Sequence, residues 1–300
     1  VADVESGEIT SINWRRPDWG HSTDQYLARV NWTDDSLFVQ RVNREQTLLE
    51  AVQFMVFDHP DKGLRLYEAT VFQLDEQPNW INLSSDFESV GASGIVMSEE
   101  LQGFRQISLL RPSRTQPVPL IGGDWVIDSV QHVDAASGVI HFTGFRDSPL
   151  ERHLYRATIS LTDPAARNDV EIERITETGK SWTVNVATDG QSFVGTSSSP
   201  GHPPQTGLYS SSGSLIAWIE ENALTEKHPY HPYLSGHTCP EFGTLTADDG
   251  QTLHYSLLRP SDFDPSRPYP VILDVYGGPH VQTVTRGWGS LSDQYLSRQG

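Results

Sequence analysis

Hydrophobic and polar residues alternate over short stretches of the first 220 residues, which is the pattern of half-buried β-strands. Clear examples are residues 26–32, 36–41 and 47–57. Gly, Asp, Asn and Pro separate these stretches, and helix-period segments of convincing length are absent from this part of the sequence. Many short strands with turn residues between them predict a mostly β fold: a sandwich, a barrel or a propeller.

A weak internal repeat favours the propeller. Four segments each contain a small or acidic turn, an apolar strand, a polar loop and a second strand, and they begin at Asp34, Ala92, Ala136 and Asp189. Their spacing of about 45 to 60 residues suits propeller blades with long loops. One blade cannot bury both of its faces alone, so blades stack around an axis. We therefore expect about four blades, with a β-sandwich as the alternative.

The pattern changes at residues 222–240, where Pro and His crowd together and no periodicity survives. This predicts a linker, which Pro229 and Pro232 should hold extended. The segment also contains four side chains of the zinc-binding kind: His228, His231, His237 and Cys239. Their spacing matches no compact metal motif, so we favour a structural role for them and expect neither a metal nor another cofactor.

The pattern after residue 240 is that of the beginning of an α/β domain. An Asp-Gly turn at 249–250 predicts a hairpin. Residues 271–276 form a dense apolar run, which predicts a strand buried on both faces of a parallel or mixed sheet. A Gly-Gly-Pro sequence breaks this run at 277–279, and residues 288–298 then show the apolar spacing of a helix.

Composition narrows the function. The chain has 21 Lys and Arg against 39 Asp and Glu, a formal net charge of -18, which argues against a nucleic-acid binder because phosphate neutralisation needs a cationic face. No apolar run approaches the roughly 18 residues of a membrane span. A single cysteine, Cys239, excludes an intrachain disulfide.

Long motifs near the C-terminus carry a resemblance to a known family. They are HPYHPYL (228–234), PEFGTL (240–245), RPYPVILDVYGGPHVQ (267–282) and DQYL (293–296). Weaker, collinear matches lie upstream, at WTDDSLFVQRVNR (32–44), GFRQISLL (103–110), GGDWVIDSV (122–130) and RHLYRATI (152–159). By these motifs the chain resembles the prolyl oligopeptidase family of serine peptidases, in particular the bacterial type of its dipeptidyl-peptidase-IV-like branch.

The resemblance implies an eight-bladed β-propeller that caps an α/β-hydrolase domain. Residues 1–221 would then be later blades of the propeller, 222–240 a linker or crossover, and 241–300 the truncated beginning of the catalytic domain. The implied activity is that of a serine exopeptidase that releases Xaa-Pro or Xaa-Ala dipeptides through an acyl-enzyme. Family membership further implies peptide or protein N-termini as substrates, an extracytoplasmic location and a homodimer of the full-length protein.

The resemblance also assigns site residues. Tyr276 matches the family position whose phenol supports the oxyanion hole, and Trp80 lies where relatives place residues that line the cavity. A blade-core position is the alternative for Trp80. The serine elbow, read as GxSxG, is absent from the sequence, and the resemblance places nucleophile, acid and base beyond Gly300. We therefore expect a fragment that is inactive alone.

Two pairs of adjacent glutamates, Glu99-Glu100 and Glu220-Glu221, invite comparison with the family's pair that holds the substrate's ammonium group. The family's pair lies upstream of the blade at 32–44, so both pairs are interpreted as solvated turns and the true pair is expected before Val1. Two alternatives stay open: an acylaminoacyl- or tripeptidyl-peptidase of the same superfamily, or a propeller interaction module without catalysis.

Overall fold

The computed structural model describes residues 1, 5, 7, 9–16, 24–33, 36–59, 63–76, 80–100, 103–111, 116–162, 170–278 and 281–299. The chain divides into two compact units. One comprises Val1–Ile140 and Ala157–Glu171, and the other His141–Arg156 and Ile172–Gly300.

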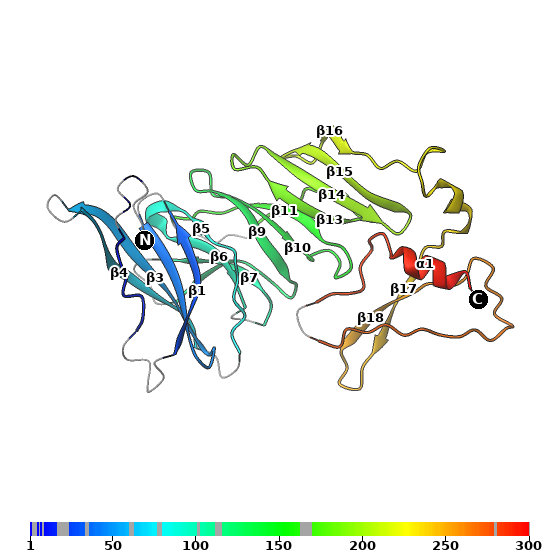
Figure 1. Ribbon diagram of the computed structural model, residues 1–300, viewed down its shortest axis with the longest axis horizontal. Coiled ribbons are helices and arrows are strands. Elements are labelled where there is room, and N and C mark those ends of the chain that lie inside the picture. The colour runs from blue at the N-terminus through cyan, green and yellow to red at the C-terminus, as the bar shows by residue number, and fades with distance from the viewer. Residues whose placement is uncertain are drawn as a thin grey trace. The chain divides into compact units, whose positions relative to one another are not determined.

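Within these residues, strands form four successive sheets of four strands each (Figure 1). The first contains β1 (Gln25–Trp32), β2 (Ser36–Asn43), β3 (Leu48–His59) and β4 (Gly63–Glu76). The second contains β5 (Glu88–Ser89), β6 (Ile95–Glu99), β7 (Gln106–Leu110) and β8 (Val118–Ile121). The third contains β9 (Ile127–Asp134), β10 (Val139–Gly144), β11 (His153–Thr158) and β12 (Ile172–Arg174). The fourth contains β13 (Ser181–Val186), β14 (Ser192–Ser199), β15 (His202–Ser210) and β16 (Leu215–Glu220).

These sheets are the predicted propeller blades. Strands in each sheet neighbour one another in chain order, and each sequence repeat supplies the two central strands of one blade: β2 and β3, β6 and β7, β10 and β11, β14 and β15. The mostly β fold is thus confirmed. The sandwich alternative, which requires two facing sheets, is wrong.

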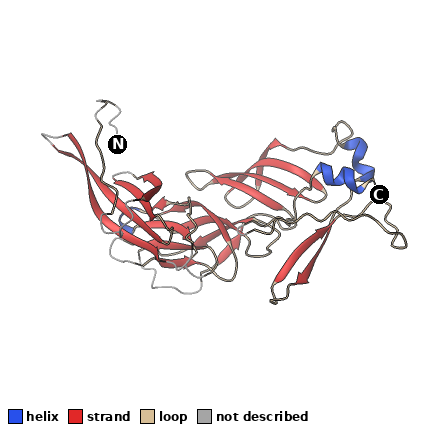
Figure 2. Ribbon diagram, turned by 60° about the horizontal axis from the view of Figure 1, so that its bottom comes forward, coloured by secondary structure: helices blue, strands red, loops and turns tan. Residues whose placement is uncertain are grey.

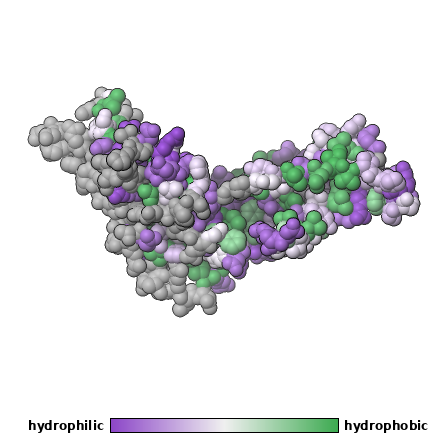
Figure 3. Space-filling model, turned by 90° about the horizontal axis from the view of Figure 1, so that it is seen from below, coloured by the Kyte–Doolittle hydropathy of each residue, from purple (hydrophilic) through white to green (hydrophobic). Residues whose placement is uncertain are grey.

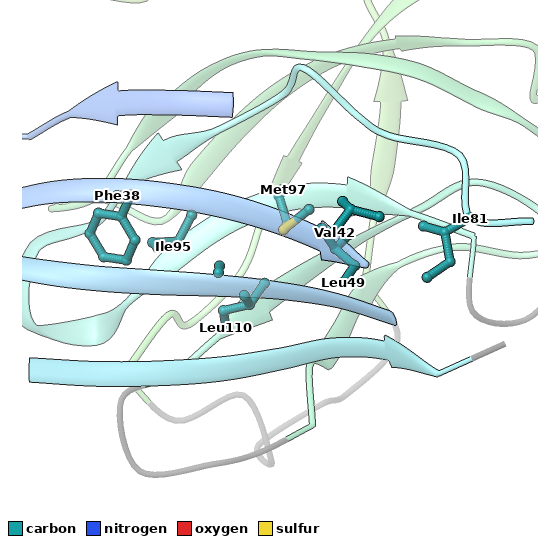
Figure 4. Close-up of a cluster of buried hydrophobic side chains, with 8 residues drawn as sticks. Phe38, Val42, Leu49, Ile81, Ile95, Met97 and Leu110 are labelled. Carbon is teal, nitrogen blue, oxygen red and sulfur yellow. The ribbon is translucent and has the colours of Figure 1, made fainter. Parts of the chain in front are cut away.

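Neighbouring blades bury apolar faces against each other. Phe38, Val42 and Leu49 of the first blade pack with Ile95, Met97 and Leu110 of the second, together with Ala51 and Ile81 (Figure 4). Within the second unit, Leu154 and Ile175 of the third blade meet residues of the fourth: Trp182, Val184, Phe193 and Tyr209. Such burial is the main favourable term in folding. Some strands, such as β13, alternate between buried and exposed positions, whereas the central strands β2 and β7 are buried along their whole length.

The part of the chain after the blades contains a 3-10 helix, η2 (His231–Gly236), a hairpin of β17 (Glu241–Thr246) and β18 (Thr252–Leu257), and one α-helix, α1 (Leu291–Ser297) (Figure 2). The predicted hairpin is confirmed, with Gly250 in the left-handed region at φ +87°. The predicted helix is confirmed but shorter: the side chain of Ser290 caps it by accepting from the amide of Ser292. None of the described helices is long and apolar enough to cross a membrane.

Two expectations are wrong. Residues 222–240 are not extended throughout, because η2 forms with Pro232 in its first turn, where a missing N–H costs nothing. Residues 271–276 are not a strand, and Val271, Ile272 and Leu273 are 83%, 73% and 81% exposed. A strand needs a neighbour to satisfy its backbone, and no described strand pairs with this run. Figure 3 shows hydrophobic surface on the second unit, which contains this run. The domain boundary at residue 241 stays a prediction.

Candidate active site

The turn that follows residues 271–276 places the Tyr276 side chain at the surface of the second unit. Gly277 has φ +66°, a left-handed conformation that glycine adopts without strain. A Cβ on Gly278 would lie 2.7 Å from Cε1 of the Tyr276 ring, so a side chain at this position would displace the phenol. Gly277 therefore allows the backbone to turn, and Gly278 leaves room for the Tyr276 ring.

Tyr276 is 56% exposed, so its phenol O–H can reach a bound molecule. A hydroxyl of this kind donates a hydrogen bond to an oxygen that gains negative charge, as in acyl transfer. A Tyr that packs at the end of a strand would have a purely structural role, but this does not describe Tyr276, because residues 271–276 form no strand.

Downstream of the turn, Arg286 is fixed to the loop between β10 and β11. Its backbone N–H donates to the carbonyl of Leu150 at 2.9 Å, and its Nε lies 3.4 Å from Oε1 of Glu151. Its guanidinium also lies over the ring of Phe242 in β17, with 5.1 Å between Cζ and the ring centroid. Three contacts from one residue thus join the 281–289 segment to the third blade and to the hairpin.

Glu151 is itself held rigidly. Its side chain is 10% exposed, and Oε2 accepts from the backbone amide of Gly179 at 2.9 Å and lies 3.2 Å from Nε2 of His153. Because a carboxylate only accepts, Nε2 of His153 is the donor, and Nδ1 faces the hydroxyl of Thr176 at 3.0 Å. Burial lowers the pKa of His153, with the hydrogen bond to Glu151 opposing this shift.

Two of the four side chains of the zinc-binding kind, His237 and His228, hydrogen-bond to protein groups. Nε2 of His237 donates to the carbonyl of Pro200 at 2.8 Å, and Nδ1 lies 2.9 Å from the hydroxyl of Tyr230. The two ring nitrogens of His228 bond Asn222 and the amide of Tyr230. Cys239 is exposed and is a free thiol. The structure therefore supports the structural role for His228 and His237.

Trp80 belongs to the first unit and Tyr276 to the second, so each is described within its own unit. Trp80 is 64% exposed, which makes the blade-core alternative wrong and leaves its indole accessible. A role in substrate binding stays a prediction.

The glutamate pairs are only partly as expected. Glu99 accepts from the hydroxyl of Ser108 at 2.6 Å, and Glu100 accepts from the side-chain amide of Asn82 at 2.7 Å. Glu100 also pairs with Arg105 at 3.2 Å. The solvated-turn interpretation is wrong for this pair, because side chains of neighbouring segments occupy the carboxylates.

Glu220 ends the exposed strand β16 and accepts from the amide of Asn222 at 2.9 Å. Glu221 follows it and is exposed.

Comparison with known proteins decides the family. Residues 1–204 match the family model described as the dipeptidyl peptidase IV N-terminal region, which is more than half of the chain. The chain belongs to the dipeptidyl peptidase IV family. The predicted resemblance is thereby confirmed.

Relatives of this dipeptidyl peptidase IV family member include a probable dipeptidyl-aminopeptidase B of Emericella nidulans, 26% identical over 98% of this chain and 32% of the relative. Human dipeptidyl peptidase 8 is 27% identical over 87% of this chain and 34% of its own length. The crystal structure of Porphyromonas gingivalis dipeptidyl peptidase 4 matches the fold with a TM-score of 0.74 at 21% identity, over 93% of this chain and 37% of that one. The chain spans about a third of the length of the curated relatives it matches.

Sequence reasoning predicts a role for Tyr276, which stays a prediction, and it missed Glu151 and Arg286. Their contacts join positions 135 residues apart, and neither lies in a pattern that marks a buried acid or its partner. The sequence feature that comes closest to marking Glu151 is its position directly before the RHLYRATI motif. It is an acidic residue next to a strand of buried side chains.

Proposed function

We propose that this chain is part of a serine exopeptidase that releases Xaa-Pro or Xaa-Ala dipeptides from peptide N-termini. The supporting observation is the DVYGGP turn, which exposes the Tyr276 phenol in a member of the dipeptidyl peptidase IV family. The nucleophile, acid and base would come from chain beyond Gly300. Trp80 would border the substrate path.

In this proposal a serine hydroxyl attacks the carbonyl of the second residue while a histidine accepts its proton. The carbonyl oxygen becomes an oxyanion, to which Tyr276 donates its O–H. The C–N bond then breaks, the amine leaves with the proton, and water hydrolyses the ester. A preorganised donor of this kind lowers the barrier by about 3–4 kcal/mol.

The test is the natural chain extended through its serine, assayed with a chromogenic Xaa-Pro substrate. We expect Tyr276→Phe to lower turnover by tens-fold or more, about 2–4 kcal/mol of transition-state stabilisation. Tyr255→Phe is a control in the β17–β18 hairpin, with a partly exposed phenol as well. Unchanged turnover in Tyr276→Phe would remove Tyr276 from the mechanism.

We further propose that the 300-residue chain alone has no peptidase activity. Hydrolysis by this chain that a serine reagent abolishes would contradict this. Substrate panels on the extended chain separate the alternatives: a preference for blocked N-termini supports an acylaminoacyl-peptidase, and release of three residues supports a tripeptidyl-peptidase. An extracytoplasmic location and homodimerisation of the full-length protein also belong to this proposal.

A further inference from the structure

Residues 281–289 follow the turn at Tyr276 in the sequence and contact the blades through Arg286. Among the described residues, the turn has few other restraints: 271–276 pair with no strand, and Tyr276 is more than half exposed. On the N-terminal side, the nearest fixed point is Tyr269, whose hydroxyl accepts from the amide of Asp264 at 2.9 Å. Among the described residues on the C-terminal side it is Arg286, ten residues after Tyr276.

We propose that Arg286 is a positioning residue for Tyr276, and that Glu151 is the anchor through which the third blade holds it. This inference rests on the proposed function, because it concerns the same oxyanion donor. The joint between blade and turn is the Arg286–Glu151 ion pair together with the hydrogen bond from the Arg286 amide to Leu150.

Glu151 suits an anchor because it is rigid on its own side. Leu150 is buried, and the Glu151 carboxylate is held by the Gly179 amide and by His153, which is fully buried. One oxygen of the carboxylate, Oε2, faces Gly179 and His153, and the other, Oε1, faces Arg286. A fixed carboxylate restrains the guanidinium more strongly than a mobile surface acid would.

Two residues beyond Arg286, a second contact prevents the segment from turning about the ion pair. The backbone amide of Trp288 donates to Oγ of Ser198 in β14 at 3.1 Å. Between these two points, Gly287 lies close to Ser198, where a Cβ would be 3.3 Å from Oγ. The segment is therefore tied to two blades within three residues, which fixes its direction as well as its position.

Arg259 provides a matched control. It has similar exposure, 42% against 45% for Arg286, it pairs with Glu241 at 3.2 Å, and its guanidinium lies over the ring of Phe263 at 4.8 Å. Arg259 thus makes the same two kinds of side-chain contact, but within the region after the blades. Arg259→Met therefore also removes one charge and one cation–π contact, but it removes no contact with the third blade.

The first measurement uses the 300-residue chain and does not depend on activity. Hydrogen exchange of the backbone amides at positions 286 and 288 is compared between wild type, Arg286→Met, Glu151→Gln and Arg259→Met. We expect exchange at both amides to become at least about tenfold faster in the first two variants and to stay unchanged in Arg259→Met. Unchanged exchange in Arg286→Met would overturn the joint.

The second measurement uses the natural chain extended through its serine, with active sites counted by a serine-directed reagent. We expect Arg286→Met to lower kcat per active site by about tenfold or more with little change in KM, because a small misplacement of a catalytic group slows chemistry more than binding. Arg286→Lys, which retains the charge, should recover most of kcat.

The outcomes are distinct. Faster exchange with unchanged kcat would overturn the positioning role while leaving the joint in place. Equal losses in Arg286→Met and Arg259→Met would overturn it too, because they would indicate general destabilisation. If the wild-type extended chain cleaves no Xaa-Pro substrate, the proposed function fails and the role of Arg286 with it, whereas the exchange result still decides whether the joint exists.

Discussion

The imidazole of His237 lies flat against the indole of Trp288, with ring centroids 4.5 Å apart and planes inclined by only 7°. Tyr230 meets both rings edge-on, at 5.7 Å from His237 and 5.5 Å from Trp288. His237 also donates to Pro200 in the turn between β14 and β15. One aromatic cluster thus joins the segment before β17, the fourth blade and the segment before α1.

Replacing His237 should therefore lower the stability of the second unit against unfolding. His237→Ala removes a stacked ring pair and two hydrogen bonds, and we expect the free energy of unfolding to fall by about 2 kcal/mol. Urea unfolding followed by far-ultraviolet circular dichroism measures this. His231→Ala, at a half-buried histidine outside the cluster, should cost much less. Equal losses in the two variants would contradict a specific role for the cluster.

Gln294 of α1 hydrogen-bonds to the backbone of Thr238 through both the oxygen and the nitrogen of its side-chain amide. Its Oε1 accepts from the Thr238 N–H at 3.1 Å and its Nε2 donates to the Thr238 carbonyl at 2.7 Å. The side chain is buried, so Gln294→Glu leaves a carboxylate oxygen against a carbonyl oxygen and should cost about 2–3 kcal/mol at neutral pH.

Protonation of the introduced carboxyl restores a donor, so this loss should shrink at acidic pH. Unfolding at pH 4 and pH 7 tests the idea, with Gln299→Glu at an exposed position as the control. A loss that does not depend on pH would show that the donor to Thr238 contributes little.

Gly94 and Gly138 share one structural role in two blades. Both follow an Ala-Ser pair, both have positive φ, +125° and +72°, and a Cβ on either would collide with a carbonyl oxygen. For Gly138 the oxygen is that of Ile159, at 2.0 Å. We expect Gly138→Ala to cost about 3 kcal/mol or more, because backbone strain adds to a contact that only a shift of the main chain relieves.

Gly250→Ala is the control for the conformational part alone. Gly250 also has positive φ, +87°, but nothing lies within 4 Å of its ideal Cβ. We expect a cost of about 1 kcal/mol there, measured by thermal unfolding. A similar cost at both sites would mean that the blade turn yields easily to a side chain.

The Ala-Ser-Gly repeat also shows why the blades could be predicted from sequence. The turn glycines and the alternation of strands such as β13 depend on local geometry and on burial of one face, and both leave a trace at fixed spacing. The hairpin at Gly250 and the helix capped by Ser290 were predictable for the same reason.

What sequence could not predict depends on distant partners. Residues 271–276 have the composition of a buried strand, but composition does not supply the neighbouring strand, and the run is exposed. The pairing of Glu151 with Arg286 joins a blade to a segment after the blades, and the pairing of Gln294 with Thr238 joins two segments that are 56 residues apart. A local sequence pattern predicts neither pairing. The role predicted for Tyr276 rests only on the family motif that surrounds it.

Asp86 is a half-buried carboxylate at the junction of the second and third blades. It accepts from the hydroxyl of Ser98 at 2.7 Å and from the backbone amide of Val130 at 3.0 Å. Burial raises the pKa of Asp86, more than these hydrogen bonds and Arg105 lower it. The folded protein therefore binds the Asp86 proton more tightly than the unfolded chain does.

The stabilisation from this proton is complete below the usual pKa of an aspartate and is lost as pH rises through the raised pKa of the folded state. Asp86→Asn removes that dependence, so its free energy of unfolding should fall less than that of wild type between pH 4 and pH 7. For Asp134→Asn we expect the opposite: its free energy of unfolding should fall more than that of wild type between pH 4 and pH 7. Hydrogen bonds from Ser137 and Ala136 lower the pKa of Asp134, so the stabilisation from its carboxylate is lost as pH falls. Urea unfolding at a series of pH values measures both differences. Parallel curves for wild type and Asp86→Asn would show that Asp86 ionises as easily in the folded protein as in the unfolded chain.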